Sequence, residues 1–94
     1  MPHVIYTTFE KTDENVSFYA RSAATQEHWR TTYIDTGKVV WFVEVGINTM
    51  KVTVIYDSIE IKEEMLNDPI LQQDRLERTN YNLLNNISEI VIKE

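Results

Sequence analysis

Four segments of the chain have the period of two that is typical of strands, and two other regions have helical spacing. The alternating segments are rich in β-branched and aromatic residues, which suit a pleated strand. They predict strands over residues 3–10, 38–45, 50–56 and 87–92. Between the second and third of these, the stretch Gly46-Ile47-Asn48-Thr49 supplies turn residues and predicts a hairpin.

The first predicted helix follows Ser22, whose hydroxyl can accept a hydrogen bond from a free amide of the first turn. Four residues at spacings of three and four share one face of this helix: Thr25, Trp29, Thr32 and Tyr33. Gly37 fits the position just past the helix, where the backbone turns left-handed. The helix is therefore expected to end before Lys38.

The second helical region covers residues 59–86 and contains a break at Asn67-Asp68-Pro69. Proline cannot continue a helix interior, but it suits the first position of a new helix, with Asp68 as its cap. The sequence leaves open whether this region is one kinked helix or two.

The order strand, helix, strand, strand, helix, strand is that of the ferredoxin-like βαββαβ fold. With 94 residues, the chain predicts a single domain over residues 1–94. The expected α+β architecture is a four-stranded antiparallel sheet with two helices on one face.

Such an architecture leaves the second face of the sheet uncovered. The segment 38–45 is apolar on both faces, which predicts a central strand covered on both sides. Burying an apolar side chain of valine or phenylalanine size gains about 1.5–3 kcal/mol, so an exposed cluster favours association. We therefore expect a twofold-symmetric homodimer through the open sheet face. Its interface, or that with another protein, is expected to include Val40, Trp41, Phe42 and Val43.

Composition excludes several classes of function. Fifteen acidic and nine basic residues give a net charge of −6, and the scattered basic residues argue against direct nucleic-acid binding. The chain has no cysteine, and His3 and His28 lack the spacing of a metal site, so neither a metal nor another cofactor is expected. No apolar run is long enough for a membrane span, and the start Met1-Pro2-His3 does not match a signal peptide, so a cytoplasmic location is expected.

Few side chains suggest chemistry. The pair His28-Trp29 is the candidate for a catalytic role, because histidine titrates near neutral pH. Trp29 belongs to the helix face that predicts core, which favours a structural role for both residues. The charged residues Asp74, Arg75, Glu77 and Arg78 are interpreted as mixed surface charge, with Asp74 and Arg78 as an i,i+4 ion pair.

Short motifs add a resemblance. The order of elements, the helix end Tyr33-Ile34-Asp35-Thr36-Gly37-Lys38 and the break Asn67-Asp68-Pro69 resemble the dimeric α+β barrel group of ferredoxin-like folds, which includes antibiotic-biosynthesis-type monooxygenases. Together with Asn80-Tyr81-Asn82, these motifs also resemble small uncharacterised proteins of large tailed bacteriophages. The resemblance implies a dimeric barrel, and a location in the host cytoplasm or the virion.

Two functions follow as hypotheses. The first is a non-enzymatic, phage-encoded interaction or structural protein that dimerises and binds a protein partner. The second is a cofactor-independent monooxygenase-like enzyme, with His28, Trp29 or Trp41 lining a cavity. An enzyme needs a pocket of roughly 300 Å³ or more with convergent polar groups, here around His28, whereas an interaction protein can be solid throughout.

Overall fold

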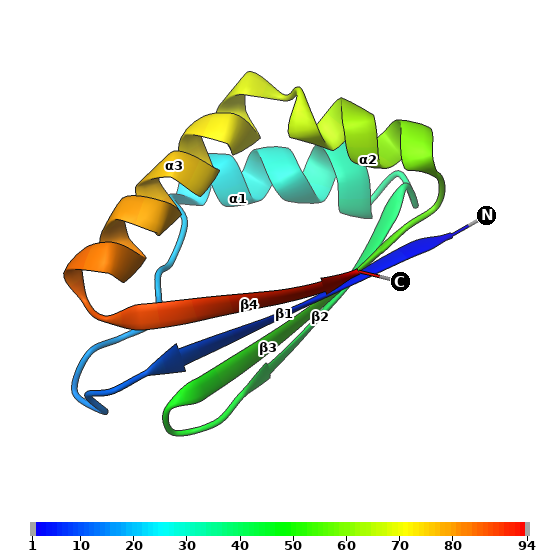
Figure 1. Ribbon diagram of the computed structural model, residues 1–94. Helices are drawn as coiled ribbons and strands as arrows, with labels where there is room; N and C mark the ends of the chain where they lie inside the picture. The colour runs from blue at the N-terminus through cyan, green and yellow to red at the C-terminus, as the bar shows by residue number, and fades with distance from the viewer. Residues whose placement is uncertain (1, 94) are drawn as a thin grey trace.

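The computed structural model describes residues 2–93 and contains one sheet and a layer of helices (Figure 1). In chain order the elements are β1 (His3–Lys11), α1 (Ala23–Trp29), the π-helical turn η1 (Arg30–Ile34), β2 (Val39–Val45), β3 (Thr49–Tyr56), α2 (Ile59–Leu66), α3 (Pro69–Leu84) and β4 (Ile87–Lys93). The predicted strands are confirmed to within a residue or two at their ends.

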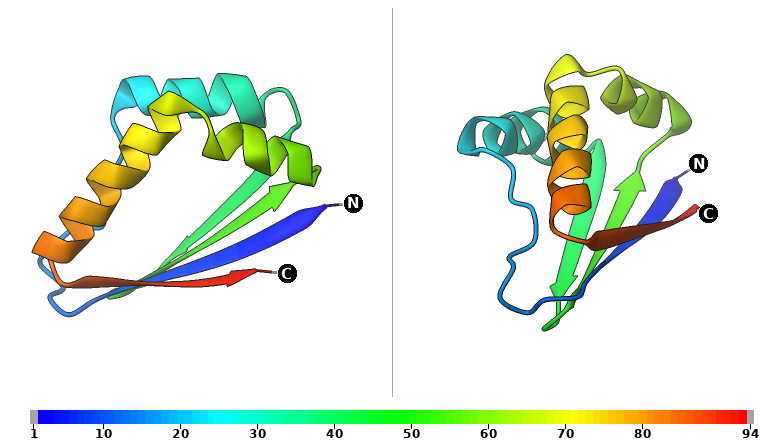
Figure 2. Two further views of the ribbon diagram at one scale, coloured as in Figure 1. Left: turned by 45° about the horizontal axis from the view of Figure 1, so that its top comes forward. Right: turned by 60° about the vertical axis from the view of Figure 1, so that its left-hand side comes forward.

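The four strands form an antiparallel sheet in the order β2-β3-β1-β4. All helices lie on one face of this sheet, and the other face carries no element of the described chain (Figures 1 and 2). The protein is thus an α+β domain compatible with a ferredoxin-like fold. Among residues 2–93, no helix combines the length and the apolar character needed to cross a membrane.

The predicted central position of the segment 38–45 is wrong, because β2 is an edge strand. From the hairpin, β3 returns to pair with β1, and β4 occupies the far side of β1, so β2 keeps a single neighbour. Only its first residue, Val39, is buried, and exposure reaches 68% at Val45. The apolar residues on both faces of β2 therefore reflect contact with the helices on one side and an apolar open face on the other.

Local sequence signals explain where the helices begin and end. The Ser22 hydroxyl accepts a hydrogen bond from the amide of Thr25 at 3.2 Å, as expected of an N-cap. Gly37 has a φ of 76°, as expected of a residue just past a helix end. The region 59–86 is two helices: Ser58 caps α2, and Asp68 caps α3 with Pro69 in its first turn.

The core of the domain is small. Seven hydrophobic side chains among the described residues are buried, and five of them form one cluster between helices and sheet: Trp29, Tyr33, Val39, Tyr56 and Leu71. Trp29 and Tyr33, predicted to share a helix face, are 4% and 1% exposed, although the π-helical turn begins between them. The rest of the space between helices and sheet is only partly filled, and there the candidate site lies.

Candidate functional site

The amphipathicity of α3 is reversed. Five residues on its sheet-facing side line the space beneath it, four of them polar: Leu71, Asp74, Arg75, Arg78 and Asn82. By contrast, four large apolar residues of the same helix are exposed: Ile70, Leu76, Leu83 and Leu84. A surface helix ordinarily turns its apolar stripe inward, since burial of a polar group is costly unless it is paired. The polar side chains of α3 therefore lie inside the domain, where they need hydrogen-bond or charged partners.

These residues border a cavity of about 690 Å³ between the helices and the sheet. Its walls also include the inner face of all four strands, parts of α1 and α2, and the segment 18–21 that precedes α1. Six aromatic side chains line it: Phe9, Phe18, Tyr19, Trp29, Trp41 and Tyr56. Both tryptophans of the chain are among them. A cavity of this volume with mainly apolar and aromatic walls is typical of a small-molecule site.

The connection between β1 and α1, residues 12–22, is here called the strap (Figure 2). Its residues 18–21 form one wall of the cavity. The hydroxyl of Tyr81 donates to the carbonyl of Ser17 at 2.6 Å. The ammonium of Lys11 donates to the carbonyl of Val16 and lies 4.8 Å from the ring centroid of Phe18. Side chains of α3 and β1 therefore fix a segment that has no regular secondary structure of its own.

A polar cluster joins the strap to α3 at the cavity wall. Asp74, which is 5% exposed, accepts a hydrogen bond from the hydroxyl of Tyr19 at 2.8 Å and lies 3.6 Å from Nε of Arg21. Burial, reinforced by the hydrogen bond to Asp74 and its charge, raises the pKa of Tyr19 well above its ordinary value. Tyr19 is therefore a neutral hydrogen-bond donor near pH 7.

The Arg21 guanidinium lies against the two tryptophans, 5.3 Å from the ring centroid of Trp29 and 6.0 Å from that of Trp41. Burial lowers the pKa of Arg21 from its ordinary value, and the negative charge of Asp74 opposes this shift. Arginine side chains are not deprotonated in proteins, so the cavity wall holds a charged guanidinium over aromatic rings.

Four buried side-chain nitrogens among the described residues have no hydrogen-bond partner: Nη1 of Arg21, Nε1 of Trp29, Nε of Arg78 and Nδ2 of Asn82. All four are hydrogen-bond donors. All four belong to residues that line the cavity. A buried donor left unpaired costs about 1–3 kcal/mol, so a ligand that brings acceptor atoms to this wall is favoured.

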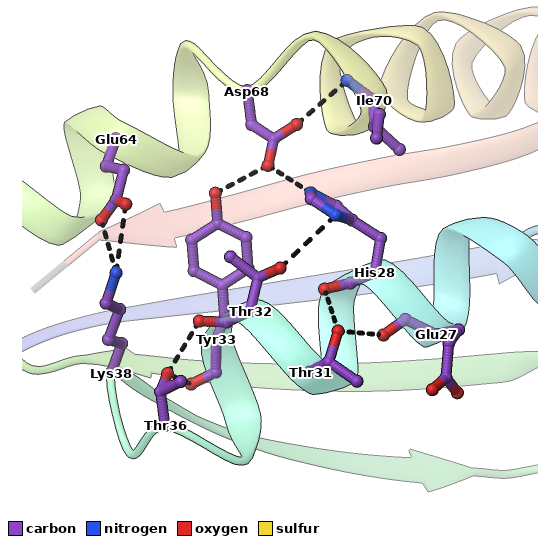
Figure 3. A network of polar contacts seen from close by, with 10 residues as sticks. All are labelled: Glu27, His28, Thr31, Thr32, Tyr33, Thr36, Lys38, Glu64, Asp68 and Ile70. Carbon is purple, nitrogen blue, oxygen red and sulfur yellow. Dashed lines mark hydrogen bonds and ion pairs between the residues drawn. The ribbon is translucent and has the colours of Figure 1, made fainter.

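His28 takes part in a different network, between α1 and the junction of α2 with α3 (Figure 3). Its Nε2 lies 2.6 Å from Oδ2 of Asp68, and the hydroxyl of Tyr33 donates to the same oxygen at 2.8 Å. The other carboxylate oxygen accepts the amide of Ile70 at 3.0 Å. Burial alone would raise the pKa of Asp68, but these hydrogen bonds outweigh it and lower the pKa below its ordinary value. The network connects α1 and the π-helical turn η1 to the N-terminus of α3, which Asp68 also caps.

The sequence candidates thus fall into three places. Trp29, Trp41 and Val43 line the cavity, whereas His28 does not. Val40 and Phe42 alternate with these residues and lie on the opposite face of the sheet. Of the four residues assigned to an interface, Trp41 and Val43 therefore face the helices.

The interpretation of Asp74 and Arg78 as an exposed ion pair is wrong. Asp74 is buried against the strap, and Arg78 lies 3.4 Å from Glu89 of β4. Sequence reasoning also missed Arg21 and Asn82. The signal that could have found Asn82 is its spacing from apolar Leu71, since positions 71, 74, 78 and 82 share one helix face. Arg21 lies outside this helix and has no such signal.

The face of the sheet opposite the helices, here called the outer face, is apolar over much of its width. Five of its large hydrophobic side chains are exposed: Tyr6, Val40, Phe42, Ile90 and Ile92. They come from three strands, and half-buried Ile55 of β3 lies between them. A contiguous apolar face of this kind is typical of an interaction surface.

Within residues 2–93, no group of three or more metal-ligating side chains is close enough to hold a metal ion. Comparison of the chain with protein-family models, with curated proteins and with solved structures finds no match.

Proposed function

We propose that this protein binds a small organic molecule in the cavity between its helices and its sheet. The ligand has an aromatic or apolar body and at least one group that accepts hydrogen bonds. The observation that carries this proposal is a cavity of about 690 Å³ with aromatic walls, lined by four residues that each have a buried side-chain nitrogen without a partner. In such a site the apolar walls supply affinity, and a few polar groups fix orientation.

Binding ranks above catalysis in this proposal. The volume exceeds the roughly 300 Å³ that an enzyme site requires, and Trp29 and Trp41 line it, which favours the monooxygenase-like alternative. However, both ring nitrogens of His28 face other groups, Asp68 on one side and Thr32 on the other. The candidate catalytic histidine is thus bonded to residues of the helices and does not line the cavity.

We also propose that the outer face is covered by a second copy of the chain. Two apolar sheet faces can pack on each other with interdigitating side chains, and a twofold-symmetric interface needs only one self-complementary patch. Such a dimer would give the dimeric α+β barrel-like arrangement that the resemblance implies. The bacteriophage origin, the protein partner and the location in host cytoplasm or virion stay predictions, which capture of a specific partner from host lysate would test.

A pair of neighbouring substitutions tests the ligand-binding proposal. Thr7 lines the cavity, whereas Thr8 points to the outer face of the same strand. Anilinonaphthalene sulfonate is an aromatic molecule with acceptor oxygens that fluoresces when it leaves water. We expect Thr7→Phe to fill the cavity and weaken binding of this probe at least about tenfold, while Thr8→Phe leaves its affinity within about twofold. Weakening by Thr8→Phe alone would place the probe on the outer face and contradict the proposal.

A further inference from the structure

The charge of the cavity wall is opposite in sign to that of the chain. The chain has nine basic and fifteen acidic residues. Five basic side chains line the cavity: Arg21, Lys62, Arg75, Arg78 and Lys93. Among the described residues, only two acidic side chains do so, Asp74 and Glu89. More than half of the positive charge of an acidic protein is therefore gathered around one cavity.

The two acidic groups are already engaged. Asp74 lies 3.6 Å from Nε of Arg21, and Glu89 lies 3.4 Å from Nη2 of Arg78. Each compensates one arginine of the wall. The remaining cations of the wall therefore have no counter-charge from the acidic groups that line it.

Lys62 and Arg75 are two such cations. Neither forms an ion pair with a carboxylate of residues 2–93, and the only hydrogen bond of the Arg75 side chain there goes to the carbonyl of Leu66 at 2.9 Å. Both are half-buried. By contrast, two of the basic residues away from the cavity have acidic partners: Arg30 pairs with Glu27 and Asp35, and Lys38 with Glu64. A half-buried cation without a partner gains most from a negative charge nearby.

We propose that the cavity is selective for an organic anion, with its aromatic or apolar body against Trp29 and Trp41 and its carboxylate or sulfonate group near Arg75 and Lys62. This inference rests on the proposed function and adds the charge of the ligand to it. Arginine suits the role because its planar donors match an oxyanion in a fixed geometry. The unpaired nitrogens of Asn82 and Trp29 supply further donors in the same walls.

Two probes with the same ring system separate charge from shape. Anilinonaphthalene sulfonate carries one negative charge, and N-phenylnaphthylamine is its uncharged counterpart without the sulfonate. We expect the anion to bind at least about tenfold more tightly than the neutral probe. Arg75→Gln should weaken binding of the anion about fivefold or more and leave the neutral probe within about twofold. Lys62→Gln gives a second variant, in case loss of the bond to Leu66 disturbs the fold.

Arg30→Gln is the matched control. Arg30 is exposed on the helical layer, outside both the cavity lining and the outer face, and its loss changes the net charge by the same amount. Affinities unchanged in Arg30→Gln but reduced in both cavity variants would support the inference. Equal affinity for the two probes, or equal effects of all three substitutions, would overturn it. If both probes bind with equal affinity and Thr7→Phe abolishes binding of each, only the charge inference fails; if Thr7→Phe affects neither, the proposed function fails as well.

Discussion

The hydroxyl of Tyr19 donates a hydrogen bond of 2.8 Å to the carboxylate of Asp74, a residue 55 positions further along the chain. It joins an irregular strap to the inner face of α3, at a carboxylate that is 5% exposed and also faces Arg21. The cavity wall is thus held by a charge-assisted contact, stronger than a bond between neutral groups.

Removal of the Tyr19 hydroxyl should therefore destabilise the protein. For Tyr19→Phe we expect the free energy of unfolding to fall by about 1.5–3 kcal/mol, because a buried carboxylate loses a donor. Tyr6→Phe is the matched control, since Tyr6 is exposed on the outer face. Urea unfolding measures both. A loss for Tyr19→Phe no larger than that for Tyr6→Phe would show that this bond does not hold the strap.

Asp68 is expected to be the most sensitive residue of the network between the helices. Asp68→Ala removes an N-cap and leaves the hydroxyl of Tyr33 without its acceptor, so we expect a loss of about 2–4 kcal/mol in chemical denaturation. Asp57→Ala changes an exposed aspartate before α2 and should stay within about 0.5 kcal/mol. Equal effects of the two substitutions would contradict the proposed role of Asp68.

The carboxylate of Asp68 should also make the stability of the protein depend on pH. Its pKa is lower in the folded protein than the ordinary value of about 3.9, so its contribution is present above about pH 4 and is lost as the pH falls through the lowered pKa. We expect the difference in unfolding free energy between wild type and Asp68→Asn to be largest near pH 7 and to shrink below pH 4. A difference that is constant between pH 7 and pH 3 would exclude this linkage.

Phe42 tests the proposed homodimer. It is 55% exposed on the outer face, where a second sheet would bury it. We expect sedimentation equilibrium to show a wild-type dimer at tens of micromolar and a monomer for Phe42→Glu, because a buried unpaired charge is costly. Ile47→Glu, at an exposed hairpin position, should remain dimeric. A monomeric wild type would rule out the dimer at these concentrations.

The sequence predicted the elements well because their signals are local. The Ser22 cap, Gly37 and the Asp68-Pro69 break each depend on a few neighbouring residues, and each has the predicted role. The position of β2 is not local. It depends on which strands pair with one another. A strand with apolar residues on both faces can be a central strand, or an edge strand of a sheet whose open face is apolar.

The candidate site was harder to predict for a related reason. Its polar groups come from the strap and from α3, and only the fold brings Arg21 to Asp74. On α3 the charged residues suggested a solvent-facing side, because charged residues of a helix ordinarily face water. In the structure the polarity of α3 is reversed, because Leu71 is buried on the same side as Asp74 and Asn82.

The two indole N–H groups of the chain offer the most direct test of ligand binding in the cavity. Trp29 and Trp41 both line it, and the indole nitrogen of Trp29 has no partner among the described residues. In the ¹⁵N–¹H spectrum of the labelled protein, we predict that titration with anilinonaphthalene sulfonate shifts both indole signals and saturates at one probe per chain. Indole signals that stay in place while amide signals of Phe42 and Ile90 move would contradict the account.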